Sequence, residues 1–133
     1  MAMKNRDVYA AALRVVCESD VRGDTSDYEE RAPYLLATLI SQLSALDAAL
    51  RASSGIAGNK ITPSVFVGLD EEFPLCDALC GSAVYYLAAM LVIDENEALY
   101  ERLFALYSES ISLLQDSQAF KSHPIVDVYG ELI

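Results

Sequence analysis

The stretch Ala83-Val-Tyr-Tyr-Leu-Ala-Ala-Met-Leu-Val-Ile93 is the longest strongly apolar run in this 133-residue chain. It belongs to a predicted helix over residues 76–93, and a helix that is apolar on every face has to be covered all round. Its apolar part, residues 78–93, has about 16 residues, fewer than the roughly 20 that a membrane-spanning helix requires. Both flanks are acidic, without a cationic residue to set an orientation. We therefore expect a buried core helix, covered by three flanking helices or by neighbouring subunits.

Two helices are predicted before this core helix. The first covers residues 5–18, where valines and alanines recur at helical spacing and Asn5 is placed to cap the start. The second follows a polar loop and begins with the capping-box pattern Ser26-Asp-Tyr-Glu29. Pro33 falls in its first turn or at a kink, because proline lacks the N–H that a helix interior uses. This helix should end near Ser54-Gly55, where glycine can adopt the left-handed conformation.

A fourth helix is predicted after the acidic turn Asp94-Glu-Asn-Glu97, and it should run to about Gln115. It carries two adjacent apolar stripes, which indicate either a deep core position or a second contact surface. The first stripe is Leu99, Leu103, Leu106 and Leu113; the second is Tyr100, Phe104, Tyr107, Ile111 and Leu114.

These elements predict one domain, residues 1–133, of the all-α class: a bundle of four main helices with a long irregular loop between the second and third. Apolar residues make up 53% of the chain and charged residues 22%, which is typical of a globular protein. The loop, residues 55–75, contains Ser64-Val-Phe-Val67, which we interpret as a short strand or an extended arm. A connection of this length is often functional. Residues 118–133 are expected to form a C-terminal tail.

The net charge of −11 is distributed unevenly. Residues 1–54 hold six basic and eight acidic side chains, whereas residues 55–133 hold three basic and twelve acidic ones. Such a surface repels phosphate backbones and anionic lipids. We therefore expect neither sequence-specific nucleic-acid binding nor membrane binding. Three cysteines do not form a disulfide framework, and no signal peptide is expected, so the predicted location is the cytoplasm.

Three sets of residues have side chains that could form a reactive or metal-binding site. Cys17, Cys76, Cys80 and His123 contain the ligand types of a zinc site, but their spacing matches none of the usual metal-binding hooks, and reduced cysteine is commonly buried. A catalytic thiol would need His123, the one histidine, as its base. The acidic run 70–72 lacks the calcium-binding loop pattern. We therefore predict no catalytic residue, no metal site and no cofactor, and hence no enzyme.

Several segments together resemble the head–tail adaptor, or connector, proteins of tailed bacteriophages and prophages. They are Arg6-Asp-Val-Tyr-Ala-Ala-Ala-Leu13, the Leu-rich helix 34–50, Leu69-Asp-Glu-Glu-Phe-Pro-Leu75, Tyr85-Tyr-Leu-Ala-Ala89, Asp94-Glu-Asn-Glu97 and Leu99-Tyr-Glu-Arg-Leu-Phe-Ala-Leu-Tyr107. The resemblance covers residues 4–115 and is a pattern of residue classes. It implies a helical bundle with an extended loop that assembles as a ring below the portal, joins head to tail and lets DNA pass.

The sequence thus predicts a structural adaptor that forms a homo-oligomer and contacts phage portal and neck or tail proteins. Its location would be the bacterial cytoplasm, and the virion where the phage is intact. The alternative is a small cytoplasmic helical protein-binding module or regulator without catalytic activity. Residues 64–75 and the outer faces of the last two helices are the expected contact surfaces. The candidate interface residues are Val65, Phe66, Val67, Phe73, Tyr100, Phe104 and Tyr107.

Overall fold

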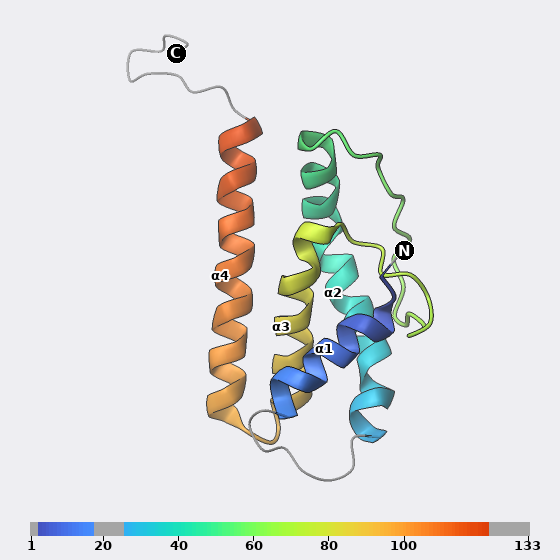
Figure 1. Ribbon diagram of the computed structural model, residues 1–133, viewed down its shortest axis with the longest axis vertical. Helices are drawn as coiled ribbons and strands as arrows, with labels where there is room; N and C mark the ends of the chain where they lie inside the picture. Colours follow the sequence, from blue (N-terminus) through green and yellow to red (C-terminus); the bar gives the residue numbers. More distant parts are fainter. Residues whose placement is uncertain (1–2, 18–25, 123–133) are drawn as a thin grey trace.

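The computed structural model describes residues 3–17 and 26–122, and these form an all-α, four-helix bundle, as the sequence predicts. The helices are α1 (Asn5–Cys17), α2 (Ser26–Ser53), α3 (Cys80–Val92) and α4 (Glu97–Ser122), with a short 3₁₀ turn, η1 (Asp77–Leu79), leading into α3. The two long helices α2 and α4 extend beyond the N-terminal end of α3, and α1 crosses the bundle (Figure 1). The predicted polar loop before Ser26, His123 and the segment 125–129 lie outside the described residues.

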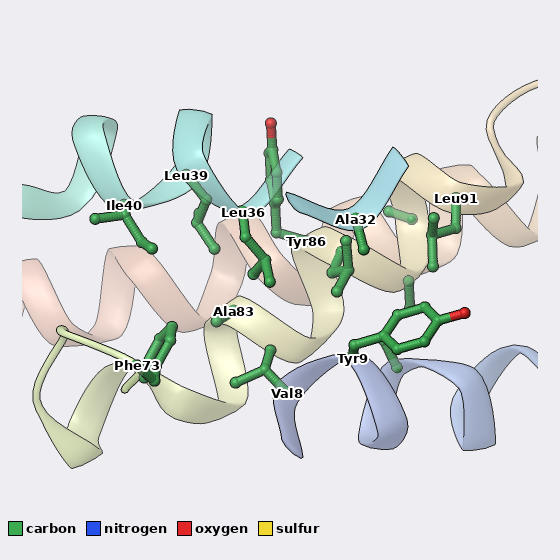
Figure 2. Close-up of a cluster of buried hydrophobic side chains, with 14 of the residues drawn as sticks. Val8, Tyr9, Ala32, Leu36, Leu39, Ile40, Phe73, Ala83, Tyr86 and Leu91 are labelled. Carbon is green, nitrogen blue, oxygen red and sulfur yellow. The ribbon is translucent and has the colours of Figure 1, made fainter. Parts of the chain in front are cut away.

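The core is built around α3, which contacts α1, α2 and α4. Eight of its thirteen residues are buried, so the three other helices of one chain provide the cover that its composition demands. Of the two predicted ways to cover α3, the structure has the flanking helices of the same chain, and this cover needs no neighbouring subunit. The buried cluster joins all layers (Figure 2): Val8 and Tyr9 from α1, Ala32, Leu36, Leu39 and Ile40 from α2, Phe73 from the loop, and Ala83, Tyr86 and Leu91 from α3.

The helix ends differ in detail from those predicted. Asn5 does not cap α1: its Oδ1, the atom that would accept a helix N–H, is buried without a partner among the described residues, while its Nδ2 donates to the carbonyl of Gly68 at 2.9 Å. Asn96 caps α4 by accepting the Leu99 N–H at 3.0 Å. Helix α4 also continues seven residues past Gln115, to Ser122, so residues 118–122 of the predicted tail are helical; residues 123–133 of it lie outside the described residues.

The predicted end of α2 is confirmed. Gly55 has φ +70°, and the pair of hydrogen bonds from Ile56 N to Arg51 O and from Gly55 N to Ala52 O forms the Schellman arrangement. Pro33 lies inside α2, not in its first turn. By length and composition alone residues 27–53 would suffice to cross a membrane, a test that core helices of soluble proteins also pass.

Replacing Gly55 with alanine should lower the free energy of unfolding by about 1 kcal/mol, because a Cβ disfavours the left-handed conformation. No atom lies within 4 Å of the added Cβ, so the cost is conformational and not steric. Gly58 is the matched control, since its surroundings are equally open and its φ is not positive. Urea unfolding of both variants measures the difference. Equal stabilities would show that the turn tolerates a side chain.

Candidate functional site

The N-terminal segment is pinned to the end of the long loop by backbone hydrogen bonds. Asn5 N donates to Glu71 O at 2.9 Å, Arg6 N to Leu69 O at 2.8 Å, and Phe73 N to Met3 O at 2.8 Å. These bonds hold residues 3–6 against residues 68–73, far away in sequence. The loop therefore consists of two parts: an anchored end at residues 67–76 and a preceding segment, residues 57–66.

The acidic run at residues 70–72 takes part in this anchoring. Asp70 pairs with Arg6 at 3.1 Å, and the Glu71 carboxylate accepts the Gly68 N–H at 2.7 Å. Arg6 also contacts Glu29, and these two carboxylates raise the pKa of its guanidinium, with the Asp70 hydrogen bond contributing most. Two of the three acids thus have partners within the chain, as expected for a structural role.

A buried ion pair anchors the loop at the other end. Asp47 is 1% exposed and accepts hydrogen bonds from Arg51 Nε, at 3.0 and 3.2 Å, and from the backbone N–H of Cys76 at 2.7 Å. Arg51 in turn donates to the carbonyls of Ala57 and Pro74, at 3.1 Å each. One side-chain pair on α2 therefore fixes both the beginning of the loop and the entry to η1.

Between these anchors, residues 57–66 form an extended arm. Among the described residues, no backbone–backbone hydrogen bond involves residues 57–66. The sequence allowed a short strand at 64–67; the structure has an extended chain there, not a strand. The arm passes beside α2 (Figure 1), and the Val67 N–H returns to the carbonyl of Pro33 at 3.3 Å. Side chains bond part of this backbone: Arg51 donates to the Ala57 carbonyl at 3.1 Å, and the Ser64 hydroxyl accepts the Phe66 N–H at 3.2 Å and donates to the Phe66 carbonyl at 2.7 Å.

The arm and residues 34–48 of α2 together carry a largely apolar surface whose one exposed charged residue is Lys60. Val65 is 81% exposed and Phe66 is 49% exposed, and the Phe66 ring packs edge-on against Tyr34, with ring centroids 5.2 Å apart. Tyr34 is itself 55% exposed. Between Arg31 and Arg51 the one charged residue of α2 is Asp47, which is buried. Apart from Tyr34, the exposed residues of this stretch are uncharged: Thr38, Ser41, Gln42, Ala45 and Ala48. We call residues 34–48 of α2 together with the arm the neutral face.

The other predicted contact residues lie elsewhere. Phe73 is 7% exposed and belongs to the core, so its side chain is not presented at the surface; Val67 is half-buried. Tyr100, Phe104 and Tyr107 are half-buried on α4, where Phe104 stacks between the two tyrosines.

Helix α4 turns one edge of its two stripes to solvent. Leu106 and Leu113 are 39% and 62% exposed, whereas Leu99 and Leu103 are buried. Tyr107 packs edge-on against Tyr86 of α3 at 5.3 Å. Burial raises the pKa of both phenols above the ordinary 10.0, with smaller contributions from a neighbouring tyrosine. These rings therefore serve mainly the α3–α4 contact.

A cavity of about 400 Å³ lies above the N-terminal end of α3, between the last turns of α2 and α4. It is lined by Met3, Leu50, Arg51, Ser54, Ile56, Phe73, Leu75, Cys76, Asp77, Ala78, Cys80, Leu114 and Ser117. Ser53 donates to Gln118 at 2.9 Å and joins the two long helices near this level. The cavity exists because α3 is much shorter than either of its long neighbours.

Both thiols at this cavity are poor nucleophiles. Burial raises the pKa of Cys76 and of Cys80 above 9.0; the Asp47 carboxylate adds to the rise at Cys76, and Asp77 adds to it at Cys80. A thiol protonated at neutral pH reacts slowly. Among residues 3–17 and 26–122, no group of three His, Cys, Asp or Glu side chains is placed to hold a metal ion. His123 and the side chain of Cys17 lie outside the described residues, so the predicted absence of a zinc site involving them stays a prediction.

The sequence reading missed two features of these sites. Tyr34, the partner of Phe66, was assigned to no contact surface, although the uncharged run of α2 around it is visible in the sequence. Met3 reaches Cys80 through the long-range pairing of the N-terminal segment, for which the local sequence carries no signal.

Comparisons with protein-family models, with curated proteins and with solved structures find no match.

Proposed function

We propose that this chain is a non-enzymatic assembly protein that joins other protein subunits through its neutral face, as a head–tail adaptor of a tailed phage or prophage does. The observation that carries the proposal is the exposed arm, where Val65 and Phe66 lie on a backbone that forms no backbone–backbone hydrogen bond among the described residues; within it, only the Ser64 hydroxyl bonds the N–H and C=O of Phe66. An extended segment of this kind can add to the edge of a partner's sheet or pair with a second arm.

Charge explains why this face, and not another, would be the contact surface. Two copies of a chain with net charge −11 repel each other over most of their surfaces. The cores of protein interfaces are depleted of charged residues and enriched in aromatic ones. The neutral face has both properties, since Lys60 is the one charged residue of the arm and Tyr34 and Phe66 form its aromatic centre.

The phage assignment rests on the resemblance of the sequence segments and on this surface. It implies a homo-oligomer with portal and neck or tail proteins as partners, located in the bacterial cytoplasm and in the virion. Genes for a portal and a capsid protein beside this one would support the assignment. Their absence would leave an assembly function without the phage context.

A second candidate function is a small monomeric binding module or regulator in the cytoplasm. It is favoured by the cover that the other helices of one chain give to α3, eight of whose thirteen residues are buried without a second copy. The neutral face would then bind a different protein.

Mutating the arm distinguishes these alternatives. The double change Val65→Asp and Phe66→Asp places two charges on the neutral face and should convert an oligomer to a monomer, measured by light scattering at several protein concentrations. Circular dichroism should stay unchanged, because both side chains are largely outside the core. Leu113→Asp is the matched control: it charges an exposed apolar residue on α4 and should leave the oligomer intact.

Two results would contradict the adaptor proposal. One is a wild-type chain that is monomeric both alone and when mixed with portal protein, which would favour the binding module. The other is an oligomer that survives the double change but dissociates in the Leu113→Asp variant, which would move the contact surface to α4.

A further inference from the structure

Three of the six sulfur-bearing residues of this chain, Met3, Cys76 and Cys80, line one cavity. Cys80 Sγ lies 3.6 Å from Met3 Sδ, and both residues line the cavity above α3 together with Cys76. Cys76 and Cys80 are free thiols, one of them buried and the other half-buried. Two thiols and one thioether thus face a single cavity of about 400 Å³, although Met3 is more than 70 residues away in sequence.

The three residues are held in place by contacts that do not use their sulfur atoms. The carbonyl of Met3 accepts the Phe73 N–H at 2.8 Å, and the backbone N–H of Cys76 donates to the buried Asp47 at 2.7 Å. A ligand set fixed through its backbone loses little freedom when an ion binds.

We propose that Met3, Cys76 and Cys80 form a three-sulfur site for a soft monovalent metal ion of the Cu(I) class. Thiolate and thioether are the ligands that select Cu(I). Zinc prefers four ligands drawn from cysteine, histidine and carboxylate, and the described residues place no three such groups together. The third sulfur is a thioether, so the site belongs to a different class from the zinc set weighed in the sequence.

Because burial, Asp47 and Asp77 raise the pKa of the two thiols, binding of the ion has to displace both thiol protons. Two thiolates and one Cu(I) then leave a net charge of −1 in a cavity that Arg51 and Asp77 both line. The half-buried position of Cys80 gives an ion a route from solvent. This inference is independent of the proposed assembly function, because no residue of the neutral face lines the cavity.

The test is an anaerobic titration of the full chain, reduced with a phosphine, with Cu(I) in competition with a chromogenic Cu(I) chelator. One ion per chain should bind, with the ultraviolet absorption of a thiolate–copper bond. Cys76→Ser, Cys80→Ser and Met3→Leu should each weaken binding by at least the factor of about 10 to 100 that follows even the loss of an outer-shell contact. Cys17→Ser and Met90→Leu are the controls and should bind as the wild type does.

Circular dichroism of the metal-free variants shows whether a variant has lost a ligand or has failed to fold. If a variant does not fold, the wild type is titrated with Ag(I) instead, and mass spectrometry identifies the cysteines that the ion protects. Protection of Cys76 and Cys80 from alkylation, with no change in the alkylation of Cys17, supports the site. Unchanged affinity in Met3→Leu, loss of affinity in either control, or displacement of Cu(I) by equimolar Zn(II) would overturn it.

Discussion

Replacing Asp47 with alanine is expected to lower the free energy of unfolding by about 3 to 5 kcal/mol, the cost of removing one partner from a buried ion pair. The change leaves the Arg51 guanidinium, whose side chain is 16% exposed, without its carboxylate. It also leaves the buried N–H of Cys76 without an acceptor. Both consequences act at once, because the same carboxylate serves the charge and the backbone. Urea denaturation followed by circular dichroism measures the loss.

The matched control is Asp27→Ala, on the same helix. Asp27 and Arg31 have the same spacing and a similar distance, 3.3 Å, but the Asp27 side chain is 66% exposed. An exposed pair of this spacing contributes only about 0.3 to 0.5 kcal/mol. If the two variants lost the same stability, burial would not be what makes Asp47 important. Asp47→Asn should fall between them, since its oxygen still accepts a hydrogen bond.

Replacing Leu87 with alanine should cost about 2 to 5 kcal/mol, the range found when a buried leucine leaves a cavity behind. Leu87 is fully buried in the middle of α3, where three helices surround it and cannot all move inward. Leu113→Ala on α4 is the control, because that side chain is 62% exposed and should change stability by less than about 0.5 kcal/mol. Thermal and urea unfolding of both variants compare them directly. A small loss at Leu87 would mean that the core repacks.

The features that follow a local pattern could be predicted from the sequence. The burial of α3 follows from its apolar composition, and the end of α2 follows from one glycine. The far end of α4 could not be predicted, because residues 116–122 lack apolar periodicity and their helix continues from the turns before them. Caps were harder still: Asn5 has the side chain of a cap, yet its orientation is set by the bond from its Nδ2 to a carbonyl 63 residues away, and its Oδ1 accepts no helix N–H.

The candidate sites divide along the same line. The exposure of Val65 and Phe66 agrees with their place in a long irregular loop, whereas Phe73, in the same loop, is buried by its anchored end. The sequence could not separate these residues, because the difference depends on which part of the loop pairs with the N-terminal segment. The cluster of sulfur atoms depends on that same long-range pairing.

The pinning of residues 3–6 also bears on how the chain folds as it leaves the ribosome. The side chain of Asn5 bonds Gly68, a partner synthesised 63 residues later. At about 5 to 20 residues per second, this partner follows Asn5 by roughly 3 to 13 seconds, and α3, which covers the apolar side of α1, is synthesised later still. A nascent chain halted before that point would display Val8, Ala12 and Val16, the kind of surface that chaperones and proteases recognise.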